Sequence, residues 1–485
     1  MNICKHDELC GGCIYQGKSY EEQLKIKEDE VLRLMAEKGV SSEHIDKIEG
    51  CSCRYRYRNK MEYTFGDLIK DGPMTLGMHK KGNYMSIITV DNCQLVDEDF
   101  NRILSFVLQF AGDKGYNFYH KKSHLGLLRN LIIRRGVRTK ELLVNVVTSS
   151  QSEFDEEAFV NGLLSLETDN KIVGILRTLN DNLADAVVCD SMQILWGRDY
   201  YMEELLGLKF KVSAFSFFQT NVEAAERLYS QALGLIDDFS GKTVFDLYCG
   251  TGTISQILAL KAKEVLGIEL VEEAAAAAEA NAKLNKLDNC KFIAGDVFEI
   301  LKTVEKKPDV IVVDPPRVGI QPKALDKILE YGVDQIVYVS CNPKTLMDNI
   351  KYMEYYGYRC KYLKPFDNFP FTKHTETVCL LTREKSVKSY AYVDITPSEL
   401  GMGGKVKKPT YKQIQAYVLE THGLKVSPLY IANVKDEFGL EKQFSYEEAG
   451  MSAKKRPNCP PEKRAAIIDA LIHFGMLDED ARETE

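Results

Sequence analysis

Between residues 206 and 385 the chain alternates short apolar, β-rich runs with helical segments, and this alternation restricts the fold more than any other feature. Apolar runs without polar alternation are typical of strands that are covered on both faces of a sheet. Runs that alternate with helices predict a mostly parallel sheet with helices on both sides, an α/β fold. We expect a helix at 271–285 and strands at 243–248, 265–269, 291–294, 309–314, 335–340 and 378–381.

The chain before this stretch has a different texture. It opens with cysteines and continues into a predicted helix at 19–38, where Ser19 and Glu22 form a capping box and Gly39 suits the C-terminal cap. Basic turns and short β-rich runs follow. The runs lie at 87–90 and 142–147.

The segment after residue 385 predicts a third part of the protein. Residues 401–408 (GMGGKVKK) have the composition of a linker, and two short helices are expected at 411–422 and 427–437, around Gly423. Such a pair is compatible with a helix-turn-helix, which binds nucleic acid, and also with a helical appendage that binds none. The sequence leaves both interpretations open.

The composition is that of a folded protein in a reducing compartment. The 485 residues are 45% hydrophobic and 28% charged, which excludes a largely disordered chain. The net charge of −8 means that an anionic partner must be held by a local basic patch. No apolar signal region opens the chain, and no apolar stretch approaches the ~18 residues of a membrane span, so we expect a cytoplasmic protein. There, thirteen cysteines are more typical of metal binding or catalysis than of disulfides.

Three cysteines near the start, Cys4, Cys10 and Cys13, follow the pattern C-x5-C-G-G-C and indicate a metal centre. The two glycines let the backbone wrap closely around whatever the sulfurs bind. Spacing alone does not choose the fourth ligand, and an iron-sulfur cluster, a zinc ion bound by four cysteines and thiols that bind nothing all remain open. The candidates for the fourth ligand are Cys51, Cys53 and Cys93.

Residues 244–252 (VFDLYCGTG) join an apolar strand to a Gly-rich turn, which predicts a loop that binds a nucleoside-containing cofactor. Gly250 and Gly252 allow close approach to the backbone, and Glu269 at the end of the next strand is placed to accept both ribose hydroxyls. The turn lacks a third glycine and a phosphate-binding lysine, so S-adenosylmethionine fits better than a pyrophosphate. Asp296 follows the third strand and is expected either to meet the adenine amine or to cap a helix.

Two motifs at the ends of later strands, 314–317 (DPPR) and 340–343 (SCNP), are expected to face one crevice. Cys341 is the candidate nucleophile, and we expect the helix N-terminus beside it to lower the pKa of its thiol. The alternative is a cysteine that only packs. Asp314 is expected to hydrogen-bond the target base.

A thiolate and a carboxylate together suit methylation of a pyrimidine at C5. Addition of the thiolate to C6 makes C5 nucleophilic, so that C5 can attack an electrophilic methyl group. The extra proton at C5 must then be removed before the thiol can leave. Glu376, which follows His374 shortly before the last predicted strand, is the candidate base.

In this combination the chain resembles the iron-sulfur type of S-adenosylmethionine-dependent RNA uracil-5-methyltransferases, which acts on 23S ribosomal RNA. The resemblance covers about residues 1–385 and rests on motifs that follow the family's order. The motifs are C-x5-C-G-G-C, DNCQLV, FFQTN, DLYCGTG, DPPR, SCNP and F-P-x-T-x-H-x-E.

The resemblance implies a role for each matching residue. Cys341 becomes the nucleophile and Glu376 the base, while Cys51 and Cys53 stay unassigned. Because the family's tRNA-directed members lack the cluster, the cysteines favour ribosomal RNA as the substrate. The cofactor and target pocket is expected from Gln219, Tyr248, Glu269 and Asp314, and a [4Fe-4S] cluster from Cys4, Cys10, Cys13 and Cys93.

The resemblance also implies a Rossmann-like class I S-adenosylmethionine-dependent methyltransferase sheet, with an N-terminal iron-sulfur and α+β region and a small helical C-terminal extension. Family members often carry a small β-barrel RNA-binding domain before the cluster, whereas Cys4 lies almost at the start here. The extension has no counterpart in the family's usual layout. The expected parts are a cluster region with an N-terminal helix at 1–95, an α+β central RNA-binding domain at 96–205, the methyltransferase domain at 206–385 and the extension at 386–485.

RNA contacts are expected from two basic stretches of this presumed monomer. Residues 114–140 carry eight Lys or Arg and no Asp or Glu, and residues 51–60 interleave arginines with tyrosines that can stack on bases. Plain solvated surface is the alternative for both. Three other functions compete: methylation of uracil C5 in tRNA, methylation of an exocyclic adenine amine, and a non-catalytic iron-sulfur protein that binds RNA.

Overall fold

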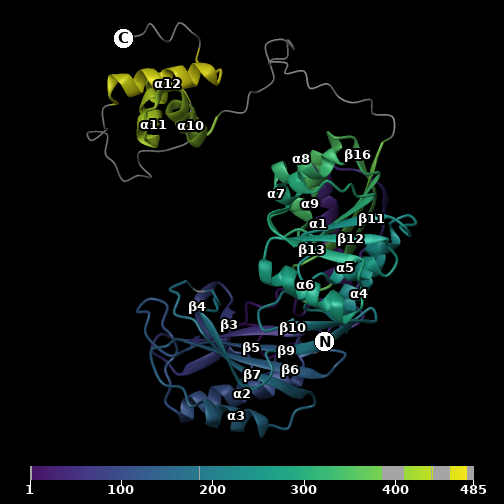
Figure 1. The fold of residues 1–485 in the computed structure, drawn as a ribbon. Coiled ribbons are helices and arrows are strands. Elements are labelled where there is room, and N and C mark those ends of the chain that lie inside the picture. The colour runs from purple at the N-terminus through teal and green to yellow at the C-terminus, as the bar shows by residue number, and fades with distance from the viewer. Residues whose placement is uncertain (1–2, 185, 385–408, 439, 441–458, 478–485) are drawn as a thin grey trace. The chain divides into compact units, whose positions relative to one another are not determined.

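The computed structural model describes residues 3–184, 186–384, 409–438, 440 and 459–477. The chain divides into two compact units, residues 1–388 and 389–485. The first contains two large sheets and the second is helical (Figure 1). The linker predicted at 401–408 lies outside the described residues. In the described part of the chain, each helix is too short or too polar to cross a membrane.

An eight-stranded sheet in the first unit confirms the predicted α/β fold. All six predicted strands are present, and β1 Ser42–Ile45 and β16 Tyr358–Phe366 extend the sheet beyond the prediction. Its strand order in the described chain is β1-β16-β17-β15-β14-β11-β12-β13, with the run from β15 to β13 parallel and β17 antiparallel to both neighbours. The predicted strands are β11 Thr243–Leu247, β12 Glu264–Glu269, β13 Cys290–Ala294, β14 Val310–Val313, β15 Gln335–Ser340 and β17 Glu376–Arg383.

Helices cover both faces of this sheet, as the alternating pattern predicts. One face packs on α4 Val222–Gly234, α5 Thr253–Ala259 and α6 Glu272–Leu284, the last of which is the helix expected at 271–285. The other face packs on α1 Tyr20–Lys38, α7 Val297–Thr303, α8 Pro322–Glu330 and α9 Pro343–Glu354. The apolar strand residues are buried between these two layers.

The N-terminal segment that contains α1 and β1 packs with the eight-stranded sheet and adds a strand to it. The predicted capping box starts α1, because Glu22 N–H donates to Ser19 Oγ at 3.1 Å and Ser19 N–H donates to Glu22 at 2.6 Å. Gly39 ends the helix with φ of 62°, the left-handed conformation that glycine adopts without strain. Val31, Leu34 and Met35 then pack into the apolar layer of α7, α8 and α9. The following strand, β1, pairs with β16 in parallel.

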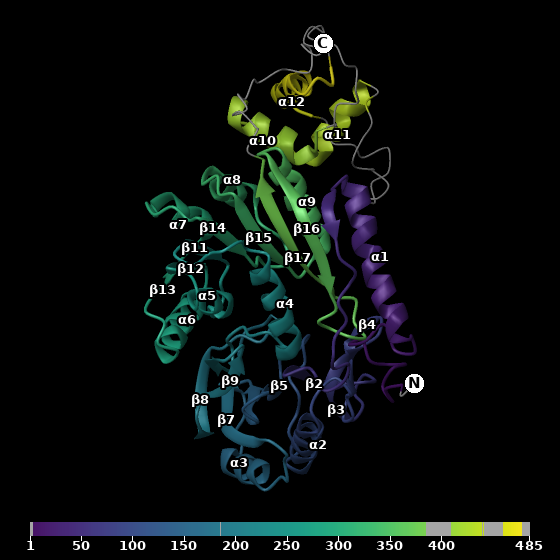
Figure 2. The same ribbon diagram turned by 90° about the vertical axis from the view of Figure 1, so that its right-hand side faces the viewer.

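A second sheet lies earlier in the chain and has the order β4-β3-β2-β5-β6-β7-β8 in its described residues. Its strands surround a core that two helices close on one side, α2 Glu98–Asp113 and α3 Glu156–Leu164. Figures 1 and 2 show these helices on the side away from the eight-stranded sheet. The strands are β2 Lys60–Asp67, β3 Met74–Lys80, β4 Asn83–Thr89, β5 Leu128–Gly136, β6 Glu141–Thr148, β7 Lys171–Leu179 and β8 Ser191–Gly197.

The boundary expected between residues 95 and 96 falls within this second sheet, because β2 pairs with β5. A hairpin formed by β9 Tyr200–Leu205 and β10 Leu208–Ser213 leads from it to the eight-stranded sheet. Tyr201, Leu205 and Phe210 of the hairpin share one apolar cluster with α4. The two sheets of the first unit are therefore joined by a continuous core.

The second unit is a small helical bundle in the residues described. The two predicted helices are observed as α10 Tyr411–His422 and α11 Pro428–Glu437, and Gly423 ends the first with φ of 67°. A further helix, α12 Pro461–His473, packs against both through Ile414, Ile431 and Ile467. A bundle with its own core fits either the helical appendage or the helix-turn-helix module, so both remain predictions.

A buried ion pair ties α1 to the loop before β17. Lys27 Nζ lies 2.5 Å from Asp367 Oδ1, and the two side chains are 1% and 0% exposed. Lys27 also donates to the Phe369 carbonyl at 3.1 Å. Removal of one member of such a pair leaves a charge without a partner in a medium that solvates it poorly.

We predict that Lys27→Met lowers the free energy of unfolding of the first unit by about 3–5 kcal/mol, because Asp367 loses its cation. Urea-induced unfolding followed by circular dichroism measures the change. Lys25→Met is the matched control, since Lys25 is an exposed residue of the same helix, and its effect stays within about 0.5 kcal/mol. Equal stability of the two variants would show that the ion pair contributes nothing.

Candidate active site

The topology of the eight-stranded sheet creates a crevice between β11 and β14. The chain runs outward from β11 through β12 to β13, and then crosses back to β14 and β15 on the other side. Loops that follow β11 and β14 therefore diverge, and ligands of open α/β sheets bind in the gap that they leave. The predicted cofactor loop follows β11 and the DPPR motif follows β14, so both line this gap.

The cofactor loop has the tight shape that its glycines predict. Gly250 and Gly252 have φ of 54° and 75°, and Tyr248 adopts the same left-handed conformation with φ of 66°. A Cβ atom on Gly252 would lie 2.7 Å from the Phe292 ring, so a larger residue does not fit there. Thr251 Oγ1 donates to the Phe217 carbonyl at 3.1 Å, which ties the loop to the FFQTN motif.

Glu269 is held where the sequence predicts a ribose-binding carboxylate. Its two carboxylate oxygens accept from Gly250 N–H and Val271 N–H, each at 2.9 Å. Each oxygen keeps a second lone pair for a ligand hydroxyl. The carboxylate is thus fixed by the cofactor loop itself.

The other predicted cofactor residues lie around this loop. Burial raises the pKa of Tyr248, and the nearby Asp296 carboxylate adds to the shift. Asp296 caps α7, because its Oδ1 accepts from Glu299 N–H at 3.3 Å, which is the alternative that the sequence left open. Gln219 accepts from Asn59 Nδ2 at 3.0 Å through its backbone carbonyl.

Cys341 lies in the turn between β15 and α9, as predicted, and is half-buried. Asn342 caps α9 by accepting from Lys344 N–H at 3.2 Å. The predicted lowering of the thiol pKa is wrong for the protein without RNA. Burial raises the pKa of Cys341 to about 11, and the carboxyls of Glu376 and Asp314 add to this rise, while Arg317 opposes it. The thiol therefore rests in its neutral form.

Glu376 opens β17 and is 5% exposed. Burial raises its pKa to about 7, against the charges of Arg317 and Lys27. Burial also raises the pKa of Asp314 well above its usual value, and Glu376 adds to that shift. The site thus brings together a thiol and two carboxyls, one of which has a pKa near neutrality, as proton transfer requires.

The N-terminal segment holds the loop that leads to Glu376. Phe371 N–H donates to Gln23 Oε1 at 2.9 Å, and the Phe371 carbonyl accepts from the N–H groups of Ile14 and Tyr15 at 2.9 and 3.1 Å. Tyr57 donates to the Pro370 carbonyl at 3.0 Å. Sequence reasoning missed this support, because the partners lie more than 300 residues apart and leave no local signal.

Four cysteines of the predicted metal centre line one cavity of about 300 Å³. They are Cys4, Cys10, Cys13 and Cys93. Thr372 and His374, from the loop before Glu376, line the same cavity. Cys51 lies elsewhere, where its sulfur accepts from Asn221 Nδ2 at 3.4 Å, and Cys53 donates to the Tyr55 carbonyl at 2.7 Å.

The cavity has the donors for a metal centre but not a formed coordination sphere. Burial raises the pKa of Cys13 to about 12 and of Cys93 to about 11, with further contributions from neighbouring thiols. Among the described residues, no group of three or more His, Cys, Asp or Glu side chains is arranged to hold a metal ion. Four thiols are nevertheless the donor set that zinc and iron-sulfur centres use, so the residues fit such a group in their chemistry.

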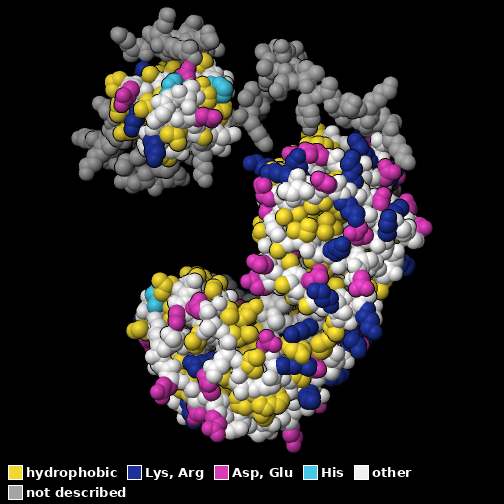
Figure 3. Space-filling view, in the orientation of Figure 1, with side chains coloured by type: hydrophobic (Ala, Val, Ile, Leu, Met, Phe, Trp, Pro, Cys, Tyr) yellow, Lys and Arg dark blue, Asp and Glu magenta, His cyan; other side chains and the backbone are white. Residues whose placement is uncertain are grey.

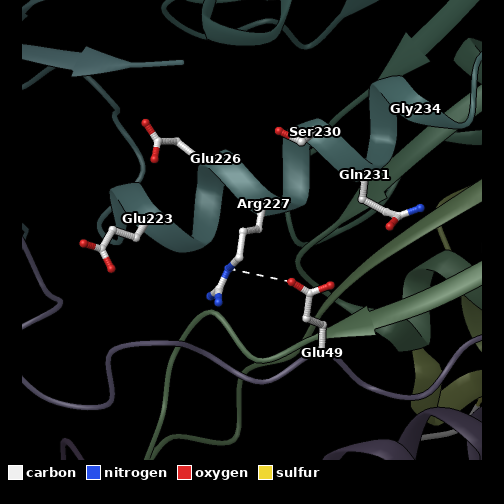
Figure 4. A pocket seen from close by; sticks show the side chains of 7 residues that line it. All are labelled: Glu49, Glu223, Glu226, Arg227, Ser230, Gln231 and Gly234. Carbon is white, nitrogen blue, oxygen red and sulfur yellow. Dashed lines mark ion pairs between the residues drawn. The ribbon is translucent and has the colours of Figure 1, made fainter. Parts of the chain in front are cut away.

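A second hollow, of about 440 Å³, runs along α4 (Figure 4). Its lining is acidic and contains none of the predicted site residues. Glu49 forms ion pairs there with Arg227 at 3.8 Å and with Lys364 at 2.7 Å. This hollow is separate from the reacting groups described above. It is lined by Glu49, Glu223, Glu226, Arg227, Ser230, Gln231 and Gly234.

Several basic residues expected to contact RNA have partners within the protein. Arg129, Arg134 and Arg135 are buried, and Arg135 pairs with Asp97 at 2.9 Å. On the face drawn in Figure 3, Lys and Arg side chains are interspersed with Asp and Glu. The stretch at 114–140 therefore offers fewer free charges than its composition suggests, although Lys122 and Lys140 are exposed.

Some side chains of the stretch at 51–60 also form contacts within the protein. Arg54 lies over the Tyr20 ring at 4.2 Å, and Tyr57 is buried. Tyr55 is exposed and packs on Phe371 with a ring separation of 5.2 Å. Contact of either basic stretch with RNA remains a prediction.

Comparison with known proteins places this site in a family. Residues 188–384 match the model of the tRNA (Uracil-5-)-methyltransferase family. An uncharacterized RNA methyltransferase of Clostridium tetani is 50% identical over 378 residues, which are 78% of this chain and 83% of that protein. One from Caldanaerobacter subterraneus is 48% identical over 380 residues, 78% and 84% of the two chains.

A solved structure shows the same fold. The tRNA (uracil-54, C5)-methyltransferase of Pyrococcus abyssi, in complex with S-adenosyl-L-homocysteine, superposes with a TM-score of 0.64 and 26% identity over 77% of this chain and 86% of that one. With the cofactor loop, the half-buried thiol and the buried carboxyls at one sheet edge, these similarities lead to one conclusion. The chain belongs to the S-adenosylmethionine-dependent RNA (uracil-5-)-methyltransferases.

Proposed function

We propose that this enzyme methylates C5 of a uridine in 23S ribosomal RNA through a covalent bond between Cys341 and C6 of the base. The observation that carries the proposal is the meeting of Cys341, Asp314 and Glu376 beside the cofactor loop. Methylation of an adenine amine needs no thiol, and a non-catalytic protein needs neither group, so this constellation argues against both alternatives.

S-adenosylmethionine, when bound, supplies an electrophilic methyl group. The residues proposed to hold it are Gln219, Tyr248, Gly250, Gly252, Glu269 and Asp296. Glu269 is already oriented by two backbone N–H groups, so it can accept ribose hydroxyls without rearrangement. Tyr248 keeps its hydroxyl proton because burial raises its pKa, and it can therefore donate a hydrogen bond.

Cys341 acts first in this scheme. Its thiol loses a proton to solvent and the sulfur bonds to C6, which moves the C5–C6 electron pair onto C5 and O4. The electron pair at C5 then bonds to the methyl carbon of the sulfonium, whose S–C bond breaks, and S-adenosylhomocysteine leaves with that electron pair. Burial raises the pKa of Asp314, which favours its protonated form. In that form it can both donate to a ring carbonyl and accept from the ring N–H, so it can anchor the base.

Glu376 completes the scheme. It takes the proton from C5, the electrons reform the C5–C6 double bond, and the sulfur leaves C6. A pKa of about 7 leaves a substantial fraction of Glu376 ionised near neutrality and makes it an effective proton acceptor.

We predict that Cys341→Ala abolishes methylation, because no adduct can form, and that Glu376→Gln lowers turnover by about 10²–10⁴-fold while a covalent enzyme-RNA adduct accumulates. Incorporation of labelled methyl groups and denaturing gel electrophoresis measure the two effects. RNA that contains 5-fluorouracil should trap the wild-type enzyme. Its C5 carries fluorine in place of hydrogen, so a base has no proton to remove there and the covalent adduct cannot break down. Cys189→Ala is the control, since that exposed cysteine before β8 lies outside the proposed reaction, and normal methylation by Cys341→Ala would refute the scheme.

The proposed substrate rests on Cys4, Cys10, Cys13 and Cys93, since the resemblance associates a cluster held by such cysteines with the members that act on 23S ribosomal RNA. The thirteen cysteines are all free, which supports a reducing cytoplasm as the compartment, and we propose that the enzyme acts there as a monomer.

Mapping of 5-methyluridine in ribosomal and transfer RNA from cells that lack the gene tests the substrate. We expect at least one position in 23S ribosomal RNA to lose its methyl group and every tRNA position to keep it, with the methyl group restored by the wild-type gene and not by Cys341→Ala. Loss confined to tRNA would assign the enzyme to the alternative substrate.

The proposal includes a [4Fe-4S] cluster on Cys4, Cys10, Cys13 and Cys93. It is supported by the single cavity that the four thiols line, and by the exclusion of Cys51 and Cys53 from it. Bound there, the cluster would tie the N-terminal segment to the loop after β4, which makes it a structural clip. The chemistry of C5 methylation itself needs no electron transfer.

We predict that the wild-type protein, after anaerobic reconstitution with iron and sulfide, contains iron and sulfide in equal amounts, and that Cys51→Ser contains as much of each as wild type. Cys93→Ser should bind much less iron. Elemental analysis and visible absorption measure this directly, without any activity assay. If the isolated protein contains zinc and no iron, the four cysteines form a zinc site and not a cluster. A protein that binds neither metal would contradict both the cluster and the zinc site.

A further inference from the structure

Arg317 and His374 come from different motifs and meet beside the nucleophile. Arg317 Nη2 lies 2.5 Å from His374 Nδ1. The Arg317 carbonyl accepts from Asn342 Nδ2 at 2.8 Å and from Thr345 Oγ1 at 3.3 Å. Arg317 is therefore tied to the turn that carries Cys341 and to the loop that leads to Glu376.

The direction of the hydrogen bond follows from the two side chains. A guanidinium stays protonated and can only donate, so His374 Nδ1 must accept, which requires a neutral imidazole. Burial lowers the pKa of His374 to about 4, and the Arg317 charge contributes, so the ring is neutral at physiological pH. The His374 ring also packs edge-on against Phe369, and the backbone N–H of His374 donates to Thr372 Oγ1 at 3.3 Å.

The charge on Arg317 matters because of what surrounds the thiol. The charged groups that act on Cys341 are Glu376, Asp314 and Arg317, and among them Arg317 is the cation. It lies on the exposed DPPR loop. A guanidinium free to turn into solvent would be screened by water and salt and would lose most of its effect on the sulfur. The contact with His374 restricts that rotation.

We propose that His374 is a positioning residue for the reaction: it holds the Arg317 guanidinium toward Cys341, so that the cation stabilises the thiolate when the thiol loses its proton to solvent. The proposal builds on the roles proposed for Cys341 and Glu376. In this proposal Arg317, oriented by the neutral His374, favours ionisation of the Cys341 thiol. The carboxyls of Glu376 and Asp314 oppose that ionisation.

The test is alkylation of Cys341 by iodoacetamide in the protein without RNA, followed by mass spectrometry of the peptide that contains it. At about pH 8 we expect His374→Leu to react about 3- to 10-fold more slowly than wild type, which corresponds to a rise of half to one unit in the thiol pKa. His374→Gln should stay close to wild type, because its amide oxygen also accepts from Arg317. His44→Leu is the control, since His44 is an exposed histidine of β1.

A double-mutant cycle separates positioning from a general structural effect. Arg317→Gln should slow the alkylation at least as much as His374→Leu, and the double variant should be no slower than Arg317→Gln, since His374 acts only through the arginine. Binding of S-adenosylhomocysteine verifies that each variant is folded. A folded His374→Leu that reacts at the wild-type rate, or a double variant slowed by the product of both factors, would overturn the proposal.

The outcome is independent of the proposed reaction. Alkylation needs no RNA, so it reports on the thiol even if the enzyme modifies another base. Capture of the wild-type enzyme by 5-fluorouracil-containing RNA reports on the reaction even if His374 has no effect. Failure of one inference therefore leaves the other to be judged by its own measurement.

Discussion

The reversal of strand order between β11 and β14 is the constraint on which the site depends. Because five neighbouring strands run parallel, their carboxyl ends meet at one edge, and the reversal parts the loops there. The cofactor loop, Asp314 and Cys341 reach the crevice from three of these strands. Glu376 reaches it differently, from the start of the antiparallel strand β17, and this places the proposed base opposite the strand end that carries the proposed nucleophile.

The electrostatics of the site explain why the Cys341 thiol rests in its neutral form. A thiol and two carboxyls share a volume that excludes much of the water, and each negative charge would raise the cost of the next. Burial holds the pKa of Cys341 near 11 and that of Glu376 near 7, so the nucleophile is not ionised in advance. A cationic ligand near these groups would favour their ionised forms.

Much of the eight-stranded sheet could be predicted from the sequence, because its strands and helices alternate locally and α1 carries its own capping box. The strands β16 and β1 were missed for different reasons. The edge strand β1 has only four residues, and β16 carries Arg359, Lys361 and Lys364 at half-buried positions, so it lacks a continuous apolar run. Arg129, Arg134 and Arg135 looked like an RNA-binding surface, but long-range packing buries them. The pKa of Cys341 was mispredicted for a similar reason: the helix N-terminus is visible in the sequence, whereas burial and the two facing carboxyls depend on the fold.

The N-terminal segment is best understood as part of the active site and not as an attached module. Its backbone and its side chains Gln23, Lys27 and Tyr57 hold residues 367–371 through hydrogen bonds and a buried ion pair. The thiol-lined cavity shares Thr372 and His374 with the same loop. A change at the part of the cavity wall formed by Thr372 and His374 would therefore act on the loop that leads to Glu376. The position of Glu376 and the state of the cysteines are thus linked by a few residues of one loop, although more than 280 residues separate Cys93 from Glu376 in the sequence.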